Sequence, residues 1–134
     1  MSQHNTNPAF TGRGILIEAA ELHIVSLPLI TPFVISNQTL TDKTFPLLVL
    51  KGEGIEGIAE AVMDQIPDYL EETIPAAMAF LRDVLLPRIV GKRVASPYEL
   101  EPILAPWRGN RMAKAVVEMA FWDLWSKSLG LPLK

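Results

Sequence analysis

The chain has 134 residues, enough for one domain with a hydrophobic core, and its 12 basic and 15 acidic residues leave a net charge of -3. No run of Lys or Arg is long enough for phosphate contacts, and the absence of cysteine excludes disulfides, zinc-thiolate sites and thiol nucleophiles. No apolar stretch reaches the roughly 18 residues of a membrane span, and residues 1–14 lack the pattern of a secretory signal. We therefore expect a cytoplasmic protein with a disordered leader over residues 1–14 and with neither nucleic acid nor membrane as partner.

The first half of the chain predicts an antiparallel sheet. Residues 15–28 are rich in Ile, Leu and Val and end at a proline, which is typical of a strand. Residues 31–42 mix hydroxyl and amide side chains that bond their own backbone, so we expect a long loop or an irregular extended segment there. Two further apolar runs, 45–51 and 55–63, flank the short connection Gly52-Glu53-Gly54. Together these segments predict a three-stranded meander.

A change of pattern after residue 63 predicts a first helix. Residues 73–89 carry apolar side chains at helical spacing. Thr73 can cap this helix, and Pro75 falls in the first turn, where its missing N–H costs nothing. Pro87 is expected to end or bend the helix.

Two more helices are expected towards the carboxyl end. Ser96 and Glu99 have the spacing of a capping box, which predicts a short helix up to about Leu104. A third helix is predicted over residues 111–129, closed by Gly130. Because the strands come first and the helices second, the fold class is α+β, with about three helices against an antiparallel meander.

The third predicted helix is apolar around most of its circumference. Such a helix is expected to be buried on more than one side, and three strands can cover only one. We therefore expect a further packing partner or a homo-oligomer. The apolar residues are Met112, Val116, Val117, Met119, Ala120, Phe121, Trp122, Leu124 and Trp125.

Several segments resemble one family. Residues 109–124 (GNRMAKAVVEMAFWDL) and 130–133 (GLPL) resemble the helix that ends the capping domain of the o-succinylbenzoate synthase and N-acylamino acid racemase group. This group belongs to the mandelate racemase/muconate lactonizing enzyme type of the enolase superfamily. Residues 27–33 and 57–73 resemble the two specificity loops of these enzymes and the strand between them. The resemblance runs from about residue 16 to residue 134.

The resemblance implies a lid over a (β/α)8 barrel. In this family the barrel supplies the Lys acid/bases and the carboxylates that bind Mg²⁺, which holds the enediolate formed by proton abstraction next to a carboxylate. The resemblance thus makes residues 15–130 a capping domain and 131–134 the start of the connection to the barrel. This chain would then contain neither the catalytic residues nor the metal ligands of the reaction and would be inactive alone. The parent reaction is left open between o-succinylbenzoate synthesis, a step of menaquinone biosynthesis, and racemisation of N-acylamino acids.

The resemblance also implies two substrate contacts. Phe33 in the first loop and Tyr69 in the second fall where the family places apolar contacts to the substrate, although plain core packing is an open alternative for both. The sequence departs from the family pattern at four positions, which leaves the substrate open. These are Asn37, Ile58, Ala61 and Asp64.

The remaining polar candidates are interpreted as structural. His23 lies inside the first predicted strand and His4 in the leader, without a cluster of other metal ligands around either. Lys114 and Glu118 are one helical turn apart and are expected to pair at the surface. Glu71 and Glu72 come just before the first helix, where the helix dipole favours acidic side chains. The tryptophans are expected to pack in the protein rather than to stack on nucleic-acid bases. They are Trp107, Trp122 and Trp125.

A function of another class is also compatible with these patterns. The apolar third helix could serve a free-standing module that forms a homodimer or binds another protein.

Overall fold

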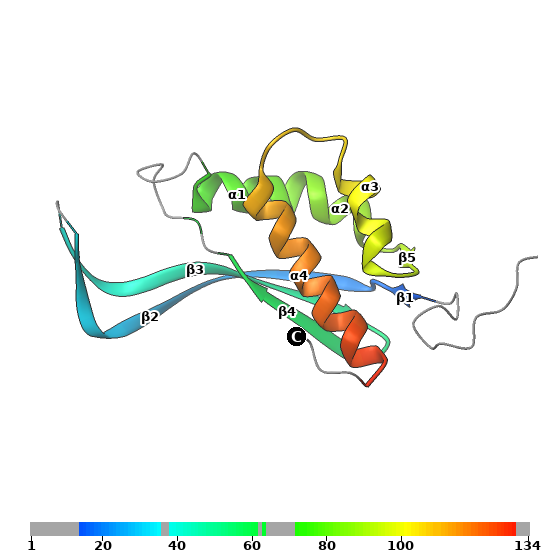
Figure 1. Cartoon of the computed structure of the whole chain (residues 1–134), viewed down its shortest axis with the longest axis horizontal. Coiled ribbons are helices and arrows are strands. Elements are labelled where there is room, and N and C mark those ends of the chain that lie inside the picture. Colours follow the sequence, from blue (N-terminus) through cyan, green and yellow to red (C-terminus); the bar gives the residue numbers. More distant parts are fainter. Residues whose placement is uncertain (1–13, 36–37, 62, 64–71, 131–134) are drawn as a thin grey trace, which may run out of the picture.

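A three-stranded antiparallel sheet with helices packed against one face forms the body of the protein (Figure 1). The computed structural model describes residues 14–35, 38–61, 63 and 72–130, and only the backbone for the described residues within 29–43. Residues 1–13 of the expected leader, and 131–134 of the expected connection, lie outside the described residues. None of the helices in the described part of the chain is long and apolar enough to cross a membrane.

The predicted meander is confirmed. Strands β2 (Ala19–Ile35), β3 (Gln38–Gly52) and β4 (Ile55–Glu60) are neighbours in that order. Gly52 and Ile55 face each other across a two-residue turn, in which Glu53 has φ 53° and Gly54 has φ 78°. Positive φ at both central positions is the mark of the tight hairpin turn whose twist matches that of the strands.

Of the two alternatives predicted for residues 31–42, the long loop is wrong and the irregular extended segment is confirmed for the described residues. The chain continues as strand through most of this segment, with Phe33 facing Leu40 and Ile35 facing Gln38. The pairing register of β2 with β3 shifts between Pro28 and Phe33, and this shift accommodates Pro28 and Pro32 in the strand. Pro28 does not end the strand, because β2 lies at the edge of the sheet, where proline is tolerated. Pairing between strands outweighs the local side-chain bonding on which the prediction rested.

The strand predicted over residues 15–28 is divided between two sheets. Residues Ile15–Leu16 form β1, which pairs with β5 (Arg93–Val94). The backbone N–H of Ile17 donates to the carbonyl of Lys92 at 3.0 Å, whereas that of Glu18 donates to the carbonyl of Lys51 at 2.8 Å. The chain therefore passes from the small sheet to the large one between these two residues.

The first predicted helix is confirmed as one continuous helical segment. It comprises α1 (Ile74–Phe80), the π-helical turn η2 (Leu81–Leu85) and α2 (Leu86–Ile89). Thr73 caps it, since its hydroxyl accepts from the N–H of Ala76 at 3.3 Å. The segment continues past Pro87, because the turn before this proline is a wider π-helical turn. In that turn the N–H of Leu86 donates to the carbonyl of Leu81.

The second predicted helix begins as a 3-10 turn, η3 (Pro97–Glu99), and continues as α3 (Leu100–Leu104). The expected capping box does not form. The side chain of Ser96 makes no capping bond, but the carboxylate of Glu99 accepts from the N–H of Ala95 at 2.9 Å. Because a 3-10 turn is tighter than an α-helical turn, the carboxylate of Glu99 reaches Ala95, the residue before the expected cap Ser96.

The third predicted helix is α4 (Arg111–Ser128), which lies across β3 and β4 in Figure 1. Its buried apolar side chains join those of the sheet and of α1 to α3 in one core. The expectation that an outside partner must cover this helix is wrong for most of its surface, because α1 and η3 of the same chain also pack on it. Met119 is its most exposed large apolar residue, at 45%. The buried apolar residues of α4 are Ala113, Val116, Val117, Ala120, Phe121 and Leu124.

Candidate functional site

Strands β2 and β3 extend beyond the helices as a two-stranded ribbon, on the left of Figure 1. Phe33 lies near the end of this ribbon in β2, where only its backbone is described. Tyr69 lies outside the described residues, so the structure gives no distance between the two predicted substrate contacts. Both therefore stay predictions.

The ribbon carries exposed apolar side chains. Ile24 is 55% exposed and Leu27 is 52% exposed, and the two have opposite parity along β2. Because side chains alternate between the faces of a strand, apolar surface is presented on both sides. A two-stranded ribbon is only marginally stable in water on its own. The ribbon is therefore suited to packing against a further protein surface.

A carboxylate next to the second predicted loop is bound to a distant helix. Both oxygens of Glu72 accept from the backbone N–H of Met112, at 3.0 and 2.9 Å, and one accepts from that of Ala113 at 3.2 Å. The residue before α4, Asn110, has φ 53° and makes no capping bond with its side chain. Glu72 thus caps the start of α4 and not that of α1, which follows it in the sequence. The prediction assigned Glu72 to the wrong helix.

Glu72→Ala is expected to lower the free energy of unfolding by about 2 kcal/mol, because it leaves partly buried N–H groups at the positive end of the α4 dipole without an acceptor. Glu72→Gln keeps an acceptor oxygen and should cost less. Urea unfolding of the two variants measures the difference. Equal stability of the alanine variant and the wild-type chain would contradict this role for Glu72.

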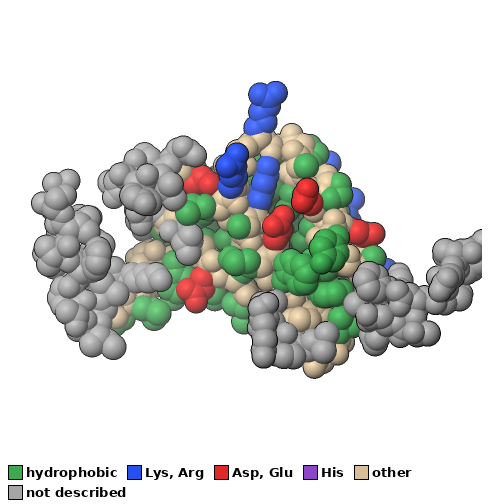
Figure 2. All heavy atoms as spheres, viewed as in Figure 1, with side chains coloured by type: hydrophobic (Ala, Val, Ile, Leu, Met, Phe, Trp, Pro, Cys, Tyr) green, Lys and Arg blue, Asp and Glu red, His purple; other side chains and the backbone are tan. Residues whose placement is uncertain are grey.

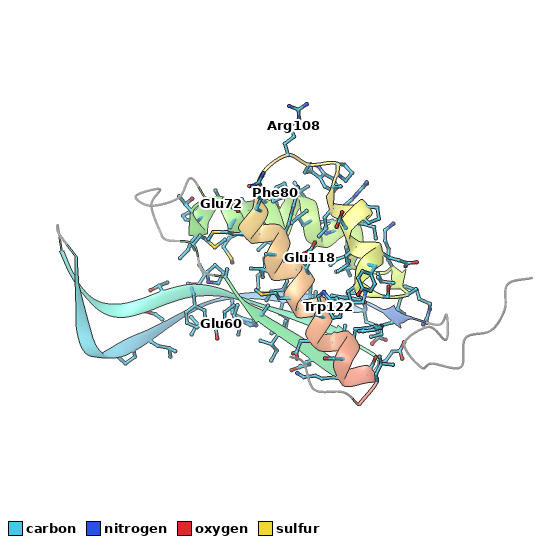
Figure 3. The ribbon with its side chains drawn as sticks, in the orientation of Figure 1. Glu60, Glu72, Phe80, Arg108, Glu118 and Trp122 are labelled. Carbon is cyan, nitrogen blue, oxygen red and sulfur yellow. The ribbon has the colours of Figure 1, made fainter. Side chains whose placement is uncertain are left out.

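The connection before α4 is held by cationic side chains. The ammonium of Lys114 donates to the carbonyl of Trp107, and the guanidinium of Arg88 lies 4.9 Å from the centre of the Trp107 ring. The expected surface pair between Lys114 and Glu118 is therefore wrong, because the backbone carbonyl takes the ammonium. Figure 3 shows Arg108, farther along the same connection, pointing away from the body of the protein.

A charged cluster lies on the face of the sheet opposite the helices. Lys51 Nζ lies 2.6 Å from Glu21 Oε2 and 3.7 Å from Glu56 Oε2, and His23 Nε2 lies 3.1 Å from Glu21 Oε1. The hydrogen bond from Lys51 is the main cause that lowers the pKa of Glu21, and the bond with His23 adds to it. Glu21 in turn raises the pKa of Lys51. His23 is exposed, in agreement with a solvated role.

Replacing Lys51 by Met is expected to bring the pKa of Glu21 back towards its ordinary value of 4.5. In the wild-type chain the folded-state pKa lies below the unfolded one, so the pair stabilises the fold above pH 4.5 and this contribution disappears as the pH falls through the folded pKa. The effect is small, because the groups are exposed. NMR titration of the Glu21 carboxyl in both proteins measures it, and an unchanged midpoint would contradict the pairing.

Within residues 14–35, 38–61, 63 and 72–130, no group of three or more His, Cys, Asp or Glu side chains could hold a metal ion. Glu60 is exposed at the end of β4 (Figure 3). The described residues therefore do not fit a Mg²⁺ site, and no metal chemistry is assigned to them.

An aromatic cluster lies along the outer side of α4. The ring of Trp122 meets Tyr98 edge-to-face at 5.8 Å and Trp125 at 5.5 Å between centroids. Tyr98 is 71% exposed, and Met119 lies one turn before Trp122. Figure 2 shows this face, with apolar side chains gathered below a group of Lys and Arg side chains. The tryptophans pack against neighbours, as predicted.

Comparison with known proteins agrees with this fold and arrangement. Residues 19–134 match the family profile described as mandelate racemase / muconate lactonizing enzyme, N-terminal domain. The chain is 53% identical to the N-succinylamino acid racemase of Thermus thermophilus over 117 residues, which are 87% of this chain and 32% of that protein. It is 37% identical to the o-succinylbenzoate synthase of Bacillus subtilis over 120 residues, 89% of this chain and 32% of the relative.

Solved structures give the same result. An enolase superfamily member from Listeria innocua superposes with a TM-score of 0.80 at 35% identity, over 86% of this chain and 31% of that one. A muconate lactonizing enzyme from Pseudomonas fluorescens, solved with muconolactone, gives a TM-score of 0.77 at 28% identity, over 88% of this chain and 32% of that one.

The chain thus spans about a third of the length of the relatives that it matches. It belongs to the mandelate racemase / muconate lactonizing enzyme family of the enolase superfamily, and it carries the N-terminal domain of that family.

Proposed function

We propose that residues 15–130 form the capping domain that closes and shapes the active site of an enzyme of the o-succinylbenzoate synthase or N-acylamino acid racemase type. The observation that carries this proposal is the match of residues 19–134 to an N-terminal domain, within relatives about three times as long. A (β/α)8 barrel is then the packing partner, and residues 131–134 begin the connection to it. The exposed apolar side chains of the β2–β3 ribbon support such a contact.

The proposed reaction begins with proton abstraction next to a carboxylate. The relatives named above are called N-succinylamino acid racemase and o-succinylbenzoate synthase, so both substrates are candidates. In the complete enzyme the barrel would supply the acid/base groups and the ligands of Mg²⁺, since active sites lie at the ends of barrel strands. The capping domain would exclude water and shape the pocket.

Phe33 and Tyr69 are the residues of this chain that we propose to touch the substrate. The test uses an enzyme in which residues 15–130 replace the matching third of the Thermus thermophilus racemase. Phe33→Ala and Tyr69→Ala are each expected to raise KM by about tenfold, which corresponds to about 1.4 kcal/mol of lost apolar contact, with a smaller effect on kcat.

The control for these variants is Val90→Ala, which removes part of an exposed apolar side chain outside the ribbon and outside both resembled specificity loops. It should leave KM within about twofold. If all three variants behave alike, or if the Phe33 and Tyr69 variants keep the original KM, the two residues pack rather than bind substrate.

An interaction module remains a second candidate function, favoured by the exposure of Tyr98 and Met119 beside Trp122. Aromatic and Met side chains are enriched in protein interfaces. If the isolated chain dimerises through this cluster, Met119→Glu should abolish the dimer in sedimentation equilibrium. A chain that stays monomeric at high concentration would exclude a homodimer through this face.

A further inference from the structure

Helix α4 approaches the edge strand of the sheet unusually closely. Strand β4 is the last strand of the sheet, and α4 runs over it in Figure 1. A side chain at Gly57 would place its Cβ only 2.2 Å from the carbonyl oxygen of Ala120 and 2.6 Å from the backbone nitrogen of Leu124. Glycine at this position therefore lets the helix backbone rest directly on the strand.

This close approach brings two charged side chains of α4 onto the backbone of β4. Asp123 Oδ2 accepts from the N–H of Ile58 at 2.9 Å, and Lys127 Nζ donates to the carbonyl of Glu56 at 2.9 Å. The same two side chains pair with each other, one helical turn apart, at 2.9 Å. Asp123 is only 18% exposed in this arrangement.

The two bonds reproduce those of a neighbouring strand. Glu56 and Ile58 flank Gly57, and an added antiparallel strand would donate an N–H to the first and present a carbonyl to the second. Lys127 takes the place of that N–H and Asp123 the place of that carbonyl. An edge strand with free backbone groups is a template for pairing with another chain, and natural proteins block such edges.

We propose that Asp123 and Lys127 form a latch that closes the edge of β4 to strand addition, and that the partner it excludes is β4 of a second copy of this chain. Two identical edges can pair antiparallel about a two-fold axis. The side chain of Ile58 is 43% exposed and would add an apolar contact across such a pair. The exposed carboxylates of Glu56 and Glu60 on the same strand oppose self-pairing further, since like charges face each other there.

Opening the latch should increase self-association. Asp123→Ala frees the N–H of Ile58, and Lys127→Ala frees the carbonyl of Glu56 while changing a side chain that is 44% exposed. Sedimentation equilibrium of the 134-residue chain is compared with each variant at about 0.15 M and about 1 M NaCl, where the Debye length falls from about 8 to 3 Å and the repulsion between the glutamates is screened. Each variant is expected to raise the association constant by at least about tenfold, and more so in high salt.

The matched control removes a different ion pair. Arg82 and Asp83 are paired at 2.7 Å on the first helical segment, away from any strand edge, so Arg82→Ala and Asp83→Ala should leave the association constant unchanged. Amide hydrogen exchange gives a second reading. In Asp123→Ala the N–H of Ile58 should exchange faster than in the wild-type chain at low concentration and regain protection as the concentration rises.

The latch proposal is overturned if Lys127→Ala, with its fold intact by circular dichroism, associates no more than the wild-type chain. It is also overturned if the Arg82 and Asp83 controls associate as strongly as the latch variants. Ile58→Pro in the Lys127→Ala background removes the outward N–H of the edge and should return the association constant to the wild-type value. Persistence of the association in that double variant would assign it to another surface.

Discussion

Gly57→Ala is expected to destabilise the fold by about 3 kcal/mol or more, at the upper end of the cost of overpacking. The added methyl group would meet the carbonyl oxygen of Ala120 at 2.2 Å and the Cβ of Leu124 at 2.6 Å. These atoms belong to the backbone and first side-chain atom of α4, so relief requires the whole helix to move away from β4. Such a movement would also stretch the bonds that Asp123 and Lys127 make to the strand.

A glycine in open space provides the control for this substitution. Gly54 has φ 78° and nothing within 4 Å of an added Cβ, so Gly54→Ala brings only the cost of a left-handed backbone, about 1–2 kcal/mol. Urea unfolding of both variants gives their free energies of unfolding. If the Gly54 variant is destabilised more than the Gly57 variant, the close packing of α4 on β4 is not a main determinant of stability.

Phe121→Ala is expected to lower the free energy of unfolding by about 3–5 kcal/mol, which is the usual cost of deleting a fully buried aromatic side chain. Phe121 is fully buried on α4, within the core that the sheet and the other helices share. Because the core is close-packed, the neighbouring side chains can fill only part of the cavity that the ring leaves.

Met119→Ala on the same helix is the matched control for Phe121. Because Met119 is exposed, its loss should change stability by no more than about 0.5 kcal/mol. Calorimetric unfolding temperatures of the two variants make the comparison. Similar losses in both variants would mean that the two sides of α4 are equally buried in solution, as they would be if an oligomer covered Met119.

The sequence predicted those elements whose signals are local. Thr73 and Pro75 mark the start of α1, and the Gly-containing connection 52–54 marks the hairpin between β3 and β4, because helix starts and tight turns each favour few residue types. The helical spacing of the apolar residues within 73–89 was equally clear.

Features that depend on distant partners were predicted poorly. Residues 31–42 have loop-forming side chains, yet their backbone is mostly taken up in the pairing of β2 with β3. The burial of α4 within the chain was underestimated, because the prediction considered only the strands as its cover. The segments α1 and η3 also pack on this helix. The bond of Glu72 to the start of α4 joins residues 40 positions apart, a distance over which the sequence carries no pattern.

The candidate site was reached only through family resemblance. Phe33 and Tyr69 have no local signal for substrate binding, since aromatic residues in strands and loops are more often part of a core. In contrast, Asp123 and Lys127 are a helical i,i+4 pair whose spacing is visible in the sequence. Their contact with β4 still required the structure, because it depends on the close approach that Gly57 permits.

The central claim is that this chain shapes an active site whose reacting groups lie elsewhere. It is tested most directly by assaying the 134-residue chain and the hybrid of residues 15–130 with the rest of the Thermus thermophilus racemase, each with N-succinylamino acids and with the precursor of o-succinylbenzoate, with and without Mg²⁺. We expect Mg²⁺-dependent turnover of at least one substrate by the hybrid and none by the isolated chain. Turnover by the isolated chain, or a folded hybrid that binds Mg²⁺ yet turns over neither substrate, would contradict the claim.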